Sequence, residues 1–141
     1  MARFLFDTNH LTHYEHRQPR VWARCQAHAP GEIALSIVTV EELIRGRLAT
    51  VAQRSAAGGA RLVAAYGFLK DACDLIRGFP IIGFDAPAEA AFRALKSTSP
   101  QAGTHDLRIA ATALANNLIV VTSNIRHFNW ITGLTIDDWT V

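Results

Sequence analysis

Apolar residues along the chain gather in short runs that alternate with longer stretches of helical periodicity. Short apolar runs are typical of strands buried in a sheet, whereas apolar positions at i, i+3, i+4 and i+7 indicate helices. The runs predict strands at 3–6, 33–35, 79–84, 118–121 and 134–136. The intervening stretches predict helices at 11–16, 20–29, 39–48, 60–76, 86–96 and 105–116.

This alternation predicts an α/β fold. Strands that are apolar at nearly every position usually lie in parallel sheets covered by helices on both faces. We therefore predict a three-layer α/β/α sandwich around a central, mainly parallel sheet of four to five short strands. Glycines at 58 and 59 separate two helices, but no linker or repeat divides the chain, so residues 1–141 are predicted to form one domain.

Two of the predicted helices have a distinct apolar face. In the helix at 105–116 this face consists of Leu107, Ala110, Ala111 and Leu114. In the helix at 60–76 it consists of Leu62, Tyr66, Leu69, Cys73 and Ile76. Residues with this spacing lie on one side of a helix, so both faces are expected to pack against the core.

Composition narrows the class of protein. No uninterrupted apolar stretch approaches the roughly 20 residues that span a bilayer, and the N-terminus lacks the pattern of a signal peptide, which predicts a cytoplasmic protein without membrane association. Cys25 and Cys73 lie far apart and are expected to be free thiols in a reducing compartment. The net charge is only +2. Only two of the fourteen basic residues are lysine, and the others are arginine. Because arginine forms ion pairs as readily as it binds phosphate, this excess alone does not indicate a nucleic-acid-binding protein.

Polar residues follow or face the carboxyl ends of the predicted strands, where open parallel sheets bind ligands. Asp7 follows the first strand, and Glu42 is predicted in the first turn of the helix after the second. Asp106 opens the helix before the fourth strand, and Asn124 follows that strand. Three carboxylates at one side of the sheet would repel one another without a cation, and oxygen ligands favour Mg²⁺ or Mn²⁺. Such a site is suited to metal-assisted phosphoryl chemistry.

Each of these residues also has a structural interpretation. Asp7 could cap the following helix, and Glu42 could form a capping box with Thr39. Asp106 would be favoured by the helix dipole, and Asn124 could be a cap or turn residue. Taken singly, none of the four distinguishes structure from function.

Further polar residues flank these positions: Thr8, Asn9, His105, Arg108 and Arg126. Thr8 and Asn9 would cap the first helix as well as Asp7 does. His105 could contact a phosphate or cap its own helix. The two arginines could hold phosphates or pair with carboxylates.

Three histidines, His10, His13 and His16, recur at a spacing of three residues. On a helix these positions spread over about 120°, which is poor geometry for three ligands of one zinc ion. We expect them on a partly exposed helix surface instead.

Four segments of the sequence resemble the PIN-domain ribonucleases and, more narrowly, the VapC-type toxins of bacterial and archaeal toxin–antitoxin pairs. They are F-D-T-N at 6–9, T-V-E-E-L-I-R-G at 39–46, G-T-H-D-L-R-I-A-A-T-A-L at 103–114 and V-V-T-S-N-I-R-H-F at 120–128. The closing G-L-x-x-x-D-W at 133–139 extends the resemblance over nearly the whole chain.

The resemblance implies a PIN-like fold and a metal-dependent endoribonuclease in which Asp7, Glu42 and Asp106 hold Mg²⁺ or Mn²⁺ and position the attacking water. It also implies an RNA substrate such as tRNA or another structured RNA, a homodimer, and a small antitoxin that blocks the site. Many family members carry a further acid at the position of His127 or near Asn124, and this chain has none there. That difference supports an alternative hypothesis, a catalytically weak PIN-like module that binds RNA or protein. A DNA nuclease of similar fold is a third hypothesis.

Overall fold

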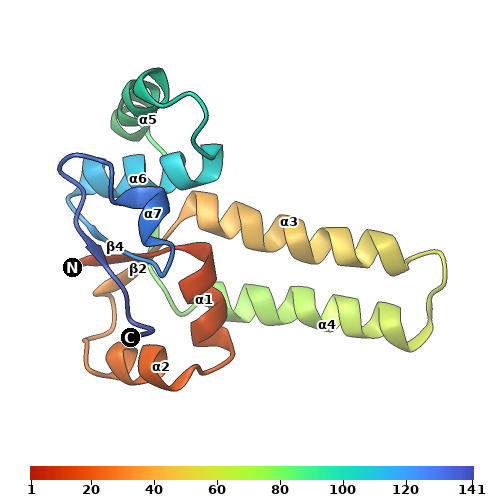
Figure 1. Cartoon of the computed structure of the whole chain (residues 1–141). Coiled ribbons are helices and arrows are strands. Elements are labelled where there is room, and N and C mark those ends of the chain that lie inside the picture. The colour runs from red at the N-terminus through yellow and green to blue at the C-terminus, as the bar shows by residue number, and fades with distance from the viewer.

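Strands and helices alternate along the chain, and the computed structural model describes all 141 residues (Figure 1). The strands are β1 (Phe4–Phe6), β2 (Ile33–Ser36), β3 (Ile81–Ile82), β4 (Ile119–Val121) and β5 (Ile136–Asp137). The helices are α1 (Thr8–Glu15), α2 (Pro19–Gln26), α3 (Ile37–Arg54), α4 (Gly59–Ile76), α5 (Ala86–Thr98), α6 (Thr104–Asn116) and α7 (Ile125–Phe128).

All five strands join one parallel sheet in the order β3-β2-β1-β4-β5. The first strand is central, so that Phe6 lies opposite Leu35 of β2 and Val121 of β4. The carboxyl ends of β1, β2 and β4 therefore meet on the same side of the sheet. This confirms the predicted parallel sheet of four to five strands.

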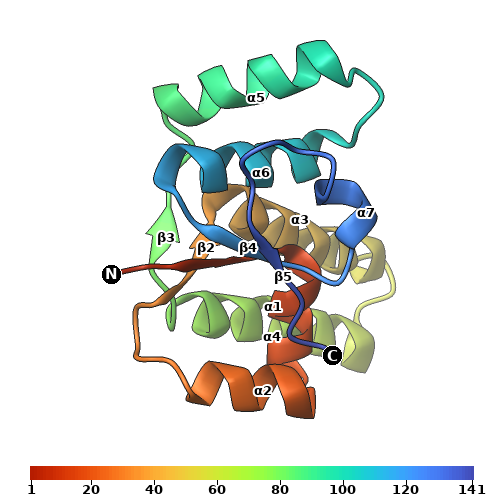
Figure 2. The ribbon, with the colours of Figure 1, turned by 60° about the vertical axis from the view of Figure 1, so that its left-hand side comes forward.

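Helices cover both faces of this sheet (Figure 2). Side chains alternate between the faces of a strand, so Leu5 packs in the core beneath α5 and α6, whereas Phe4 and Phe6 pack in the core beneath α1 and α2. The predicted three-layer α/β/α sandwich is confirmed. The apolar face predicted for α6 is buried at Leu107 and its neighbours, with only Leu114 partly exposed.

Several boundaries differ from the predictions. Helix α1 begins three residues earlier than predicted, and α2 ends three residues earlier, at Gln26. The predicted strand at 79–84 is reduced to the two residues of β3, which pair only with β2 at the margin of the sheet. The four-residue helix α7 was not predicted, because so short a segment has no apolar periodicity.

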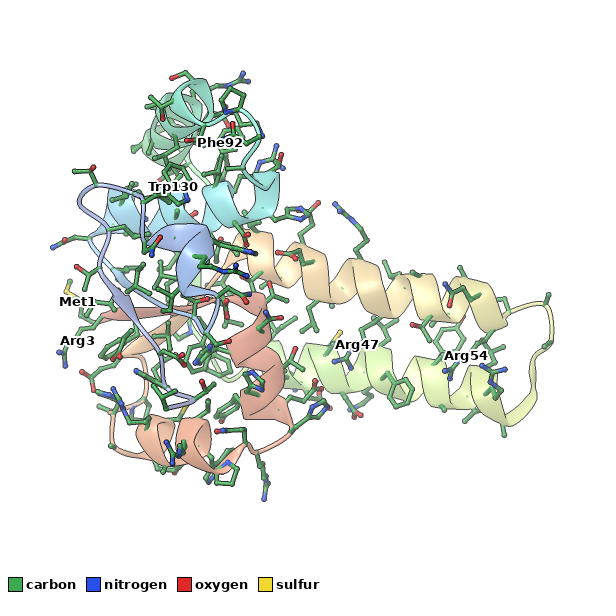
Figure 3. All side chains as sticks on the ribbon, in the orientation of Figure 1. Met1, Arg3, Arg47, Arg54, Phe92 and Trp130 are labelled. Carbon is green, nitrogen blue, oxygen red and sulfur yellow. The ribbon has the colours of Figure 1, made fainter.

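Helices α3 and α4 form a long antiparallel hairpin that extends away from the sheet (Figure 1). Two arginines cross from α3 to carbonyl groups of α4: Arg47 donates to the Phe68 oxygen at 2.7 Å and Arg54 to the Arg61 oxygen at 2.9 Å (Figure 3). No helix, these two of 18 residues included, combines the length and hydropathy needed to cross a membrane.

The apolar face predicted for α4 is only partly confirmed: Leu62, Leu69 and Ile76 are partly buried, and Ile76 packs against the core beneath α1 and α2. Ala65 and Ala72 are its buried residues, whereas Tyr66 is 56% exposed and Cys73 is exposed. Beyond the sheet, α4 has only α3 to pack against, and two antiparallel helices bury a narrow seam rather than a wide face. Small alanines occupy the buried positions, and the larger Val63, Tyr66 and Phe68 side chains remain exposed.

Both cysteines are free thiols. Cys25 is buried in α2, and this burial raises the pKa of its thiol to about 11, so that the reactive thiolate is scarce at neutral pH. Cys73 is exposed on α4.

The C-terminal Trp139 completes the core beneath α1 and α2. Its side chain is fully buried and contacts Phe4 and Phe6 edge-on, with ring centroids 5.1 and 5.4 Å apart. It also stacks on His28 at 5.3 Å, and its indole Nε1 donates to Asp137 Oδ2 at 2.9 Å. The chain end is thus anchored to the first strand.

Replacing Trp139 with alanine is expected to lower the free energy of unfolding by about 3–5 kcal/mol, because it removes a large, fully buried ring. Urea denaturation followed by circular dichroism would measure the change. Trp130→Ala is the control, since that side chain is 39% exposed and should cost no more than about 1 kcal/mol. Equal losses in both variants would contradict the proposed anchoring role.

Candidate active site

Asp7 lies at the carboxyl end of β1 and is only 4% exposed. Its Oδ1 accepts a hydrogen bond from the backbone N–H of His10 at 2.8 Å, so Asp7 is the N-cap of α1, as one of its two interpretations predicted. Its Oδ2 accepts a hydrogen bond from the hydroxyl of Thr122 at 2.6 Å. The cap therefore accounts for only one of the two carboxylate oxygens.

Thr122 directly follows β4 and is fully buried. Its hydroxyl donates to Asp7 and accepts from the backbone N–H of Asn124 at 2.9 Å. The carboxyl ends of β1 and β4 are thus joined through side chains as well as through the sheet. Asn124 stands before α7, but its side chain does not cap that helix.

Glu42 lies in the second turn of α3, not in the first as predicted. The helix begins at Ile37, and Ser36 is its N-cap, with the Val38 N–H donating to the serine hydroxyl at 3.1 Å. The predicted capping box with Thr39 is wrong, because Thr39 lies inside the helix and its buried hydroxyl has no hydrogen-bond partner. Glu42 is consequently free of any capping role.

The side chain of Glu42 contacts two other elements. Its Oε1 accepts a hydrogen bond from the Thr8 hydroxyl at 3.1 Å, and its Oε2 lies 3.9 Å from Nδ1 of His105. Thr8 follows Asp7, and His105 precedes Asp106. Glu42 therefore lies between the segments that carry the other two predicted acids.

Asp106 is in the first turn of α6, whose N-cap is Gly103, so His105 does not cap the helix. Its Oδ2 lies 2.9 Å from Nδ1 of His127 in α7, within hydrogen-bond distance. This pairing orients the Asp106 carboxylate. His127 was noted in the sequence only as the position of a missing acid, and no local pattern predicts its contact across 21 residues of chain.

The other flanking residues lie in different surroundings. Asn9 is exposed on α1. The guanidinium of Arg108 lies over the ring of Phe92 at 5.2 Å, facing α5. Arg126 is exposed on α7 and borders a cleft beside Asp106.

His10 is fully buried under Asp7, in contrast to the partly exposed surface predicted for it. Its Nδ1 lies 3.5 Å from Asp7 Oδ1, and its Nε2 accepts a hydrogen bond from the Trp139 backbone at 3.3 Å. The sequence does contain a signal for this placement, because the third residue after an N-cap Asp is held close to the capping carboxylate.

Glu42 lies near the segments that carry the other two acids, but the structure contains no group of three or more His, Cys, Asp or Glu side chains arranged to hold a metal ion. The donor set of the three acids nevertheless suits a hard cation, since it consists of carboxylate oxygens only. Oε2 of Glu42 and Oδ1 of Asp106 accept no hydrogen bond and are available to a ligand.

The sequence profile of the PIN domain matches residues 4–131. This chain belongs to the PIN domain family. The predicted resemblance to PIN-domain ribonucleases is therefore confirmed, and the PIN fold agrees with the parallel sheet described above.

The similarity to known proteins covers almost the whole chain of this PIN domain. The tRNA(fMet)-specific endonuclease VapC of Salmonella typhimurium is 27% identical, with 99% of each chain covered. Among solved structures, DNA-bound VapBC from the same species has a TM-score of 0.76 at 24% identity, with 99% of each chain covered. FitAcB from Neisseria gonorrhoeae has a TM-score of 0.71 at 26% identity, with 96% of each chain covered. The more specific likeness to VapC-type toxins is thus also confirmed.

Removing the Thr122 hydroxyl should destabilise this PIN domain. Thr122→Val is expected to lower the free energy of unfolding by about 2–3 kcal/mol, because a buried carboxylate oxygen of Asp7 loses its hydrogen bond. Chemical denaturation would measure the loss. Thr122→Ser keeps the hydroxyl and should cost about 1 kcal/mol or less. Valine and serine variants of equal stability would contradict the assigned hydrogen bond.

Proposed function

We propose that this PIN domain is a divalent-metal-dependent endoribonuclease and the toxin of a toxin–antitoxin pair. The observation that carries the proposal is the position of Glu42, whose side chain contacts Thr8 beside Asp7 and lies near His105 beside Asp106. Membership of the PIN family and similarity to proteins named tRNA(fMet)-specific endonuclease support it. We further propose RNA, including tRNA, as its substrate and the cytoplasm as its place of action.

Asp7, Glu42 and Asp106 would hold Mg²⁺ or Mn²⁺. When bound, such an ion lowers the pKa of a water molecule and stabilises negative charge on the phosphate. The chain itself supplies orientation: two hydrogen bonds fix Asp7, the Thr8 hydroxyl orients Glu42, and His127 orients Asp106. Asn124 offers a neutral oxygen after β4, in the segment where many family members carry a further acid.

Neutralising any one of the three acids should abolish most RNA cleavage. We expect Asp7→Asn, Glu42→Gln and Asp106→Asn each to lower the rate in Mn²⁺ at least about 100-fold, since even partners of metal ligands are worth 10- to 100-fold. Asn is as good an N-cap as Asp, so Asp7→Asn keeps the start of α1. Its amide nitrogen cannot accept the Thr122 hydrogen bond, so circular dichroism must show that the variant is folded. Cleavage of labelled RNA and matching DNA oligonucleotides, with and without EDTA, would measure activity and the preference for RNA.

Asp85→Asn is the matched control, because Asp85 also N-caps a helix, accepting from the Ala88 N–H at 3.1 Å, but lies outside the site. It should cleave like the unmodified protein. Activity retained in both Asp7→Asn and Asp106→Asn would refute the site assignment.

The alternative is a catalytically weak or inactive module that binds RNA or protein, favoured by the lack of a further acid near Asn124 and His127. A metal that binds the folded chain must raise its melting temperature. Stabilisation by millimolar Mn²⁺ that is lost in Asp106→Asn supports the nuclease. No stabilisation together with no cleavage supports the binding module.

We also propose that the α3–α4 hairpin contacts the antitoxin. It carries large apolar side chains that are 44–73% exposed: Leu48, Val63, Tyr66 and Phe68. Apolar surface of this kind is typical of protein interaction sites. The similar solved structures from Salmonella typhimurium, Rickettsia felis and Haemophilus influenzae are named VapBC. The homodimer implied by the resemblance stays a prediction, which light scattering of the purified chain would check.

Charged substitutions on the hairpin should weaken antitoxin binding. We expect Val63→Lys and Tyr66→Lys each to reduce affinity for the purified cognate antitoxin at least about tenfold, because a charge would be buried at the interface. Calorimetry would measure the affinity. Ala90→Lys, an equal charge change at an exposed position of α5, should bind normally. Unchanged affinity in both hairpin variants would place the antitoxin elsewhere.

A further inference from the structure

A cleft of about 460 Å³ opens beside Asp106, between the loop that joins α5 to α6 and the segment around α7. Ser99 and Gln101 line it from the loop, and Arg126, His127 and Trp130 line it from the opposite side. Its volume lies in the range of pockets that bind small ligands, about 300–1,000 Å³. The cleft is therefore large enough for one nucleotide.

Trp130 presents a large aromatic ring to this cleft. Its side chain is 39% exposed, and its indole Nε1 donates a hydrogen bond to the backbone oxygen of His127 at 3.0 Å. That bond holds the ring next to α7 (Figure 3). The other two tryptophans have partners within the chain: Trp139 is buried in the core, and Trp22 stacks on Tyr14 at 5.1 Å. Trp130 is thus the tryptophan available to an aromatic ligand.

Arg126 supplies an unpaired positive charge at the same cleft. Its guanidinium takes part in none of the ion pairs, which use Arg3, Arg24, Arg45, Arg47, Arg77 and Arg93. An exposed guanidinium without a carboxylate partner is suited to a phosphate group.

The cleft is connected to the candidate active site through His127. Nδ1 of His127 lies 2.9 Å from Asp106 Oδ2, and its backbone oxygen accepts from the Trp130 indole. Asp106 itself lines the cleft. A nucleotide bound there would consequently be a direct neighbour of a phosphate held at the three acids.

We propose that this cleft binds one nucleotide of single-stranded RNA adjacent to the phosphate that is cut, with its base stacked on Trp130 and a phosphate held by Arg126. The side chains of Ser99 and Gln101 offer hydrogen-bond donors and acceptors to the edge of the base. The position next to the cut rests on the proposed nuclease function, whereas binding of the nucleotide does not require cleavage.

Binding is tested without cleavage, using the full chain in EDTA and a fluorescein-labelled 2′-O-methyl RNA oligonucleotide in an anisotropy titration. Trp130→Ala is expected to weaken binding about 5- to 150-fold, the range measured for loss of one base–aromatic stack. Trp130→Phe retains an aromatic face and should stay within about threefold of the unmodified chain. Trp22→Phe, at a tryptophan outside the cleft, should bind like the unmodified chain.

Arg126 is tested by the salt dependence of the same binding. One phosphate contact on a single strand contributes about 0.7 to the slope of log K against log salt concentration, so Arg126→Ala should reduce that slope by about 0.7. Arg20→Ala, at an exposed arginine of α2 outside the cleft, should leave the slope unchanged.

The outcomes separate this inference from the proposed function. Trp130→Ala that binds as tightly as the unmodified chain, or an unmodified chain that does not bind the oligonucleotide, would overturn the nucleotide site even if the nuclease activity is found. Trp130-dependent binding in a chain that never cleaves RNA would uphold the site and refute the nuclease.

Discussion

Burying a carboxylate costs several kcal/mol unless hydrogen bonds or an opposite charge compensate it. At Asp7 this cost is offset by two hydrogen bonds with different consequences. The bond from the His10 N–H starts α1 at the end of β1, and the bond from Thr122 ties β1 to β4. One side chain therefore determines three features: the direction of the first helix, the junction of two central strands and the orientation of the carboxylate itself.

The other two acids are held less firmly. Glu42 and Asp106 come from helices, and their side chains are 28% and 36% exposed, compared with 6% for the side chain of Asp7. Each has one oxygen engaged by a neighbour and one without a hydrogen bond. The candidate site thus combines one carboxylate fixed by two hydrogen bonds with two more exposed carboxylates.

Two surfaces of different chemistry lie around the candidate site: the cleft adjoins it at Asp106, and the α3–α4 hairpin projects away from the sheet (Figure 1). The cleft beside Asp106 combines an aromatic ring, an unpaired guanidinium and polar side chains, which are the groups that single-stranded nucleic acids contact. The α3–α4 hairpin presents exposed apolar residues beyond the sheet (Figure 1). The parallel sheet explains where these surfaces lie, because helices cover both of its faces and leave only its ends and its projecting helices for binding.

By itself the sequence determined the parallel α/β architecture and the core face of α6, and it offered the capping role of Asp7 as one of two interpretations, because apolar periodicity and caps are local properties. The start of α3 is also local, but the sequence contains both Ser36 and Thr39 as possible caps, and the remaining features were decided by tertiary structure. Ser36 rather than Thr39 starts α3, which moves Glu42 one turn along the helix. Tyr66 is exposed because the α3–α4 hairpin extends beyond the sheet. His127 contacts Asp106 in the first turn of α6 only because α7 folds against it. Contacts between distant segments depend on which surfaces remain uncovered once the local elements have formed. A local sequence pattern does not contain this information.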